Sequence, residues 1–119
     1  QFNENSKSTA ATNFYPEAFH NSIMATEGAI ELLEKACVII INDPKGNKRL
    51  NKKIKASKEI MQEKFAKVIT IEPKGESNLT RMISVLIQGD YASTYLAILY
   101  GVDPSTTESI QILKSSTQD

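Results

Sequence analysis

The segment Ala36-Cys37-Val38-Ile39-Ile40-Ile41, bounded by Asn42-Asp43-Pro44, is a continuous apolar run rich in β-branched residues. Such a run is typical of a strand buried on both faces of a parallel sheet. Residues 67–71 alternate in polarity and predict a second strand, ended by Pro73 and Gly75. Between the two strands, apolar positions at helical spacing predict an amphipathic helix of about four turns. These positions are Leu50, Ile54, Ser57, Met61 and Phe65.

The part of the chain after the second strand predicts two more helices. Residues 79–100 are apolar on most sides, which is typical of a helix buried in a core or in a subunit interface. Ser77 or Asn78 can cap its start, and Gly101 stands where a C-terminal cap is expected. Residues 105–108, Ser-Thr-Thr-Glu, fit a capping box that opens a last short helix ending near Lys114.

The amino-terminal third carries weaker signals. Residues 1–13 are polar and could be the end of a helix followed by a loop, and a short helix is expected over residues 20–33, weakened by Gly28. The order strand, helix, strand, helix, helix predicts an α/β fold with a doubly wound parallel sheet flanked by helices. Two strands are too few for such a sheet. Either residues 1–35 hide further strands, or part of the sheet lies upstream or on a partner chain.

The charge, hydrophobicity and cysteine content of the chain exclude some classes of protein. The 119 residues have a formal net charge of zero, which argues against bulk nucleic-acid binding. Residues 45–58 nevertheless hold seven of the 14 basic residues, either as a solvated helix face or as an electrostatic funnel for anionic substrates. Polar residues interrupt the longest apolar stretch, so no membrane span is expected. Cys37 is the single cysteine; we expect a buried small hydrophobe and a cytoplasmic location.

Few residues could carry chemistry. Cys37 and His20 are too few for a zinc site, and no glycine-rich phosphate loop is present, so neither a metal nor a cofactor is expected. Acid–base chemistry remains. His20 is the only histidine, and its neutral-range titration suits it to proton transfer, although a lone histidine among aromatic residues is more often structural. Taken alone, Glu4 reads as an exposed helix residue.

Several motifs resemble the bifunctional phosphoglucose/phosphomannose isomerase family. Residues 88–104, Q-G-D-Y-A-S-T-Y-L-A-I-L-Y-G-V-D-P, are similar to a stretch near the end of that family, and I-Q-I-L-K at 110–114 is similar to its final I-x-x-L-K. Residues 3–7, N-E-N-S-K, resemble its N-E-N-A-K segment, with Ser6 replacing alanine. Residues 16–21, P-E-A-F-H-N, resemble P-E-L-N-H-N, with Ala18 and Phe19 departing from it, and G-E-S at 75–77 precedes the long helix.

The resemblance implies a sugar isomerase (SIS) fold and covers nearly the whole chain. It implies that residues 1–119 are the C-terminal portion of a single SIS-type domain. The upstream strand, the helix leading into Glu4 and a first domain with the phosphate cradle have no counterpart here. The chain begins at Gln1 rather than at a methionine, which suggests a fragment or a processed chain.

The resemblance also implies an activity, the interconversion of glucose 6-phosphate, and of mannose 6-phosphate too, with fructose 6-phosphate through a cis-enediol. Glu4 matches the general base, His20 the residue that assists ring opening, and Lys114 a lysine that holds substrate and helps to transfer protons. A homodimer is implied, with His20 serving the active site of the neighbouring subunit. Without the phosphate cradle this chain alone could be inert. A non-enzymatic sugar-phosphate-binding or dimerisation domain is the alternative.

Overall fold

The computed structural model describes residues 1–116. Its elements, in chain order, are α1 (Phe2–Asn5), η1 (Glu17–Phe19), η2 (Ile23–Glu27), α2 (Ile30–Leu33), β1 (Cys37–Ile41), α3 (Lys48–Gln62), β2 (Lys67–Ile71), α4 (Asn78–Tyr100) and α5 (Glu108–Ser115). Two units divide the chain. The first joins Gln1–Ala11 to the described part of Leu86–Asp119, and the second is Thr12–Val85. The long helix α4 contributes to both units.

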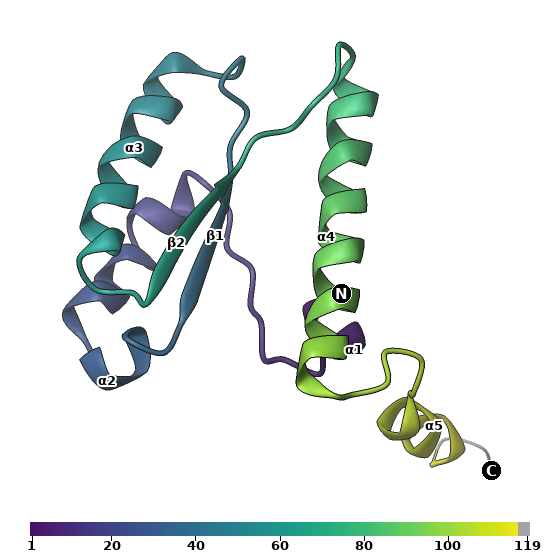
Figure 1. Ribbon diagram of the computed structural model, residues 1–119. Helices are drawn as coiled ribbons and strands as arrows, with labels where there is room; N and C mark the ends of the chain where they lie inside the picture. The colour runs from purple at the N-terminus through teal and green to yellow at the C-terminus, as the bar shows by residue number, and fades with distance from the viewer. Residues whose placement is uncertain (117–119) are drawn as a thin grey trace. The chain divides into compact units, whose positions relative to one another are not determined.

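The second unit is built on a parallel pair of strands. β1 and β2 pair in register from Cys37 opposite Lys67 to Ile41 opposite Ile71, and α3 makes the crossover between them (Figure 1). Ile54 of α3 and Ile40 of β1 are 5% and 3% exposed and form the centre of this core together with Leu33. The expected strand, helix, strand order is confirmed as a mixed α/β arrangement. The doubly wound SIS sheet stays a prediction.

The prediction that both faces of the first strand are buried is wrong for the described residues. Successive side chains of a strand point to opposite faces. Ile40 is buried, whereas Ile39 and Ile41 are 41% and 56% exposed. The second unit therefore covers one face of its sheet, on the side of α3. Cys37 shares the uncovered face and is exposed, so its expected burial is wrong as well.

Local capping chemistry explains where α4 begins and ends. The Ser77 hydroxyl accepts a hydrogen bond from the Thr80 amide at 3.1 Å, so the predicted N-cap is confirmed. At the other end Gly101 has φ +68°, and the Val102 amide donates to the Ala97 carbonyl at 3.0 Å. This is the backbone pattern of a Schellman cap, in which glycine supplies the left-handed residue without a steric penalty.

Two local predictions are corrected. The helix expected over residues 20–33 is divided into η2 and α2, which are separated at Gly28. The capping box before α5 does not form, because the N-cap Thr107 makes no side-chain capping bond. Ser105 instead donates to the Asp103 carboxylate, from its hydroxyl at 2.7 Å and from its amide at 2.8 Å.

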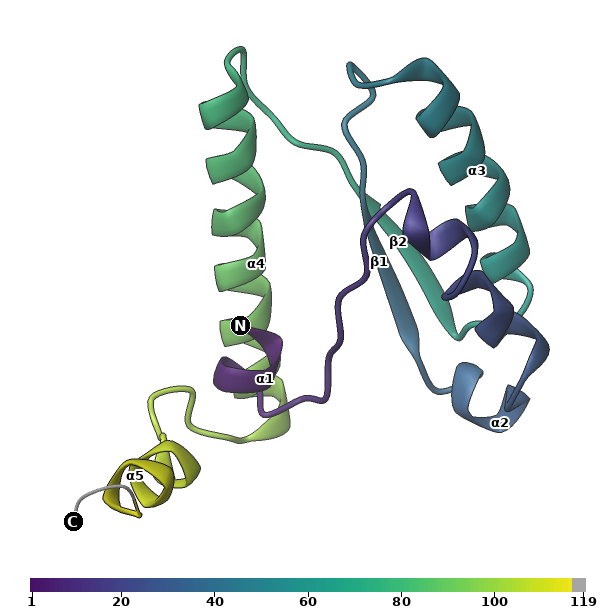
Figure 2. The same ribbon diagram turned by 180° about the vertical axis from the view of Figure 1, so that it is seen from behind.

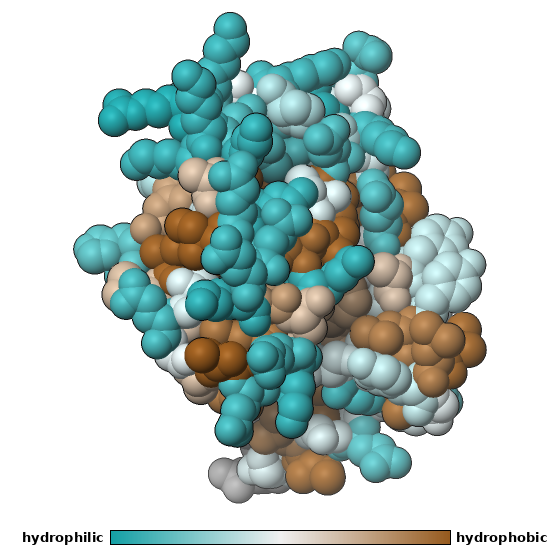
Figure 3. Space-filling model, turned by 60° about the vertical axis from the view of Figure 1, so that its left-hand side comes forward, coloured by the Kyte–Doolittle hydropathy of each residue, from teal (hydrophilic) through white to brown (hydrophobic). Residues whose placement is uncertain are grey.

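The basic residues of α3 lie mostly at the surface, as a solvated helix face requires. Lys48, Arg49, Lys52, Lys53 and Lys55 are all exposed. Figure 3 views the molecule with this side brought forward and shows hydrophilic side chains spread over much of the face, with apolar groups between them.

Helix α4 is apolar yet little buried. Of its 23 residues only Ser93 and Ala97 are buried within the described chain, while Leu79 and Leu99 are 65% and 80% exposed. Its expected burial in the core of this chain is therefore wrong, and burial in an interface stays a prediction. By length and composition α4 could also cross a membrane, with a mean hydropathy of 1.2 over its most apolar window. A single helix of this kind is weak evidence for a membrane span.

Candidate functional site

Glu4 lies on α1, a single helical turn whose other polar side chains are anchored. The Asn3 amide exchanges two hydrogen bonds with the backbone of Ala10, at 2.9 and 2.7 Å. The side chain of Asn5 donates to the Ser93 hydroxyl of α4 at 2.8 Å, and Ser93 is completely buried. Figure 2 shows α1 against the carboxyl-terminal half of α4. These anchors hold the backbone around Glu4, while the Glu4 side chain itself is exposed.

Lys7 makes the third anchor. Its ammonium donates to the carbonyl of Glu4 at 2.6 Å and to the carbonyl of Thr106 at 2.7 Å. Lys7 has φ +54°, in the left-handed region that non-glycine residues seldom occupy. The N-E-N-S-K motif contains Lys7, but sequence reasoning gave this residue no role. Its partner Thr106 lies 99 residues away, so no local pattern could have revealed the contact.

A hollow of about 490 Å³ lies beside Glu4 within the first unit. This volume falls within the range of small-molecule sites. One wall comes from α1 and the residues after it, and the other from the turn before α5 and the first residues of α5. The lining residues are Asn3, Glu4, Lys7, Thr106, Thr107, Glu108, Ser109 and Ile110. The hollow thus offers a carboxylate and several hydroxyl groups, which suit a polyhydroxylated ligand, while its ammonium, that of Lys7, is bound to two carbonyls.

The turn between α4 and α5 is held by Asp103. The two hydrogen bonds from Ser105 hold the pKa of the Asp103 carboxyl below its usual range, with a smaller contribution from the positive charge of Lys7. The Thr106 hydroxyl donates to the Asp103 carbonyl at 3.0 Å. The carbonyl that accepts from Lys7 therefore belongs to a turn with its own internal hydrogen bonds.

Lys114 and His20 belong to different units. Lys114 is exposed on α5, one turn after Ile110 and on the same helical face, but it is not among the residues that line the hollow. His20 follows η1 in the second unit and is also exposed. The neighbouring Phe19 ring stacks on Tyr15 with ring centroids 4.4 Å apart, and the Lys53 ammonium lies 5.6 Å from its centre.

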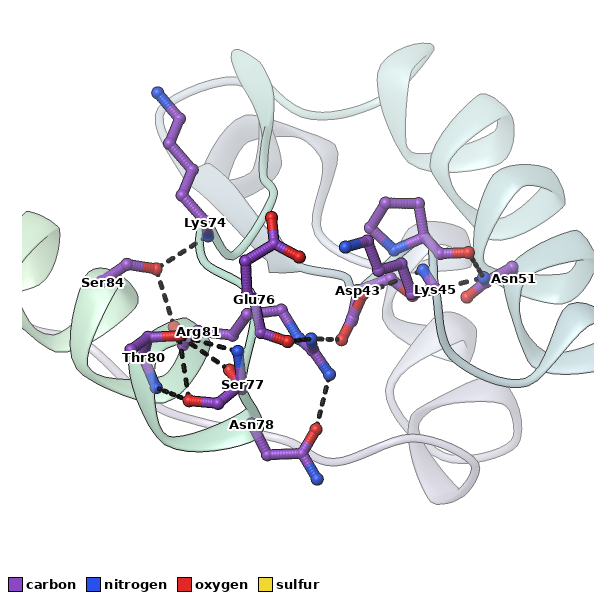
Figure 4. Close-up of polar contacts among 11 residues, drawn as sticks. Asp43, Lys45, Asn51, Lys74, Glu76, Ser77, Asn78, Thr80, Arg81 and Ser84 are labelled. Atoms are coloured by element: carbon purple, nitrogen blue, oxygen red, sulfur yellow. Dashed lines mark hydrogen bonds and ion pairs between the residues drawn. The ribbon is translucent and has the colours of Figure 1, made fainter.

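A second polar cluster, in the second unit, lies where β1 and β2 end (Figure 4). Arg81 of α4 forms an ion pair with Asp43 at 3.0 Å, and its guanidinium also donates to the Glu76 carbonyl. The Lys74 amide donates to the Ser84 hydroxyl at 2.8 Å. Ligands of open α/β sheets bind at this edge. Here, however, the Arg81 guanidinium already binds Asp43 and the Glu76 carbonyl, so it is not offered to a ligand. The cluster instead joins the loops after β1 and β2 to the start of α4. Sequence reasoning did not single it out.

No group of three or more histidine, cysteine, aspartate or glutamate side chains within residues 1–116 could hold a metal ion.

Residues 1–116 match the family described as the bacterial phospho-glucose isomerase C-terminal SIS domain. A bifunctional phosphoglucose/phosphomannose isomerase of Caldicellulosiruptor bescii is 36% identical over 97% of this chain and 34% of its own length. Enzymes of the same name from Aquifex aeolicus and Thermoplasma volcanium are each 32% identical over 96% of this chain, which covers 35% and 36% of them. The chain thus spans about a third of the length of these curated relatives. No solved structure gave a significant match.

Proposed function

The chain belongs to the family of the C-terminal SIS domain of bacterial phosphoglucose isomerases, and from this membership we propose that it forms part of a sugar-phosphate isomerase. The complete protein would interconvert glucose 6-phosphate, and also mannose 6-phosphate, with fructose 6-phosphate. The observation that carries the proposal is Glu4, a carboxylate on an anchored helical turn at the edge of a hollow of suitable size.

In this proposal Glu4 is the general base. Its carboxylate removes the proton from C2 of the open-chain aldose, and the electrons form the C1–C2 double bond while the C1 carbonyl oxygen takes up a proton to give a cis-enediol. The C2 hydroxyl then gives up its proton as the carboxyl group returns a proton to C1, and the ketose forms. A base held at hydrogen-bonding distance from the transferred proton accelerates such a step by about 10² to 10⁴-fold. The anchoring of Asn3, Asn5 and Lys7 supports this role, because a positioned group loses less freedom on reaching the transition state.

Lys114 and His20 have complementary roles in the proposal. The Lys114 ammonium would stabilise the negative charge that develops on the enediolate oxygen. His20 would move a proton at the ring oxygen and so open the cyclic sugar, a task that suits an imidazole because its ring nitrogens can both give and take a proton. The exposure of both side chains supports these roles, because each must reach a substrate.

We further propose that the protein is a homodimer in which His20 serves the neighbouring subunit. The exposed apolar surface of α4 supports an interface, because soluble proteins seldom leave a large contiguous apolar patch in water. Its exposed members are Leu79, Met82, Ile83, Leu86, Ile87, Tyr91, Tyr95, Ile98, Leu99 and Tyr100. Further polypeptide of the complete protein could cover the same face. The length of the relatives supports the view that this chain is the C-terminal portion of a longer enzyme, with the phosphate cradle in a first domain.

The test compares Glu4→Gln with the wild type in the complete protein, with fructose 6-phosphate formation measured by a coupled assay. Glu59→Gln, an exposed glutamate on α3, is the matched control. We expect Glu4→Gln to lower kcat by at least about 10²-fold and Glu59→Gln to leave it unchanged. An unchanged rate in Glu4→Gln would remove Glu4 from the mechanism. Sugar-phosphate binding without turnover in the wild type would favour the non-enzymatic alternative.

A further inference from the structure

Contacts with other segments of the first unit hold the backbone around Glu4 on α1. Asn5 bonds α1 to α4, but α4 does not line the hollow. Lys7 bonds the same segment to the turn before α5, which does line the hollow.

The two bonds of Lys7 join the opposite walls of the hollow. One acceptor is the carbonyl of Glu4 itself, and the other is the carbonyl of Thr106, directly before the residues that open α5. The single ammonium thus fixes the backbone of the proposed base relative to the wall formed by residues 106–110. A charged donor makes each of these bonds stronger than one between neutral groups.

The backbone of Lys7 adapts to this arrangement. A non-glycine residue with φ near +54° costs free energy and persists only where the surroundings stabilise it. Residues of this kind gather at functional sites.

We propose that Lys7 is a positioning residue, which fixes Glu4 at a set distance from the α5 wall of the hollow. The inference rests on the proposed function, because it assigns Lys7 a role in the reaction that Glu4 performs. Lys7 acts through the two carbonyls, so its loss should lower the rate of the chemical step more than the affinity for substrate.

The experiment uses the complete protein and three variants. Lys7→Met keeps the aliphatic stem and removes the donor, Lys7→Arg keeps a charged donor, and Lys64→Met removes an exposed lysine of the second unit as a control. We expect Lys7→Met to lower kcat by about 10 to 100-fold with KM within about threefold, because small displacements of a reacting group have effects of this size. Lys7→Arg should recover part of the loss, and Lys64→Met should match the wild type.

Two results would overturn the inference. A kcat of Lys7→Met within twofold of an active wild type would show that Glu4 needs no such support. A rise in KM alone would make Lys7 a substrate-binding group instead.

Hydrogen exchange separates this inference from the proposed function, because it needs no activity. Lys7→Met should lose amide protection at Asn5, Ser6 and Ser8, whose amides donate to backbone carbonyls, and again at residues 111–115 of α5, while protection of β1 and α3 stays unchanged. Protection that is unaffected in both segments would show that Lys7 does not connect them, whether or not the protein is an isomerase. If the wild type is inactive but the exchange pattern is as expected, the isomerase proposal is wrong and Lys7 has no role in catalysis. Lys7 would still connect α1 to the turn before α5.

Discussion

The hydrogen bond between Asn5 and Ser93 offers a quantitative test of how α1 is held. Ser93→Ala removes the acceptor of the Asn5 amide and also a hydroxyl that donates to the Asp90 carbonyl at 3.0 Å within the helix. Ser115 makes a similar intrahelical bond to Ile112 at 2.8 Å but is exposed, so Ser115→Ala is the matched control.

The expected magnitude follows from burial. A neutral hydrogen bond contributes about 1 kcal/mol net, and more when the abandoned partner is fully buried. Ser93 is completely buried, but Asn5 is only partly buried, so water can replace part of the lost bond. Alanine also favours a helix interior by about 0.5 kcal/mol over serine. Ser93→Ala should therefore cost about 0.5 to 1 kcal/mol, whereas Ser115→Ala should be neutral or slightly stabilising.

A double-mutant cycle isolates the contact from these other effects. The opening free energies of amides in α1 and α4 can be measured by native-state hydrogen exchange for Asn5→Ala, Ser93→Ala and the double variant. We expect a coupling free energy of about 1 kcal/mol. A coupling below about 0.3 kcal/mol, within the range over which independent sites add, would refute the contact and with it this account of how α1 is anchored.

The remaining predictions concern backbone conformation and charge. Gly101→Ala should cost about 1 to 2 kcal/mol in thermal or urea unfolding, since φ is +68° but an added Cβ meets no atom within 4 Å. Gly75→Ala should cost about 3 kcal/mol or more, because φ is +129° and the Cβ would collide with the Thr80 side chain; equal losses in the two variants would contradict this reasoning. The pKa of Asp103 lies below its ordinary value of 3.8, so the stability that its ionised form contributes is present above that pH and is lost as the pH falls through the lower, folded-state pKa. In Ser105→Ala the pKa of Asp103 should rise toward the ordinary value in a carboxyl NMR titration, and an unchanged pKa would argue against the hydroxyl as its main cause.

The hydrophobic pattern predicted correctly which helices and strands form, but it predicted less well how far they are buried. Runs of apolar and β-branched residues predicted β1 and β2, and apolar residues at helical spacing predicted α3. Single residues such as Ser77 and Gly101 predicted where α4 begins and ends. A continuous apolar run indicates that both faces of a strand need covering, but it does not indicate which segment covers each face. For this reason Ile39 and Ile41, and most of α4, are apolar but exposed.

Some residues of the candidate site could be predicted from their neighbours in the sequence, whereas others depend on contacts with distant segments. Glu4 could be named from its own segment, because a family motif of five residues surrounds it. The groups that hold it could not be named, since Ser93 and Thr106 are 88 and 99 residues distant from their partners Asn5 and Lys7. The capping box before α5 failed for a local reason instead. Asp103, two residues before Ser105, accepts a hydrogen bond from the Ser105 hydroxyl, and the Thr106 carbonyl in the same turn accepts from Lys7. The proposed positioning of Glu4 therefore depends on a backbone carbonyl in this turn, which no side-chain pattern could have singled out.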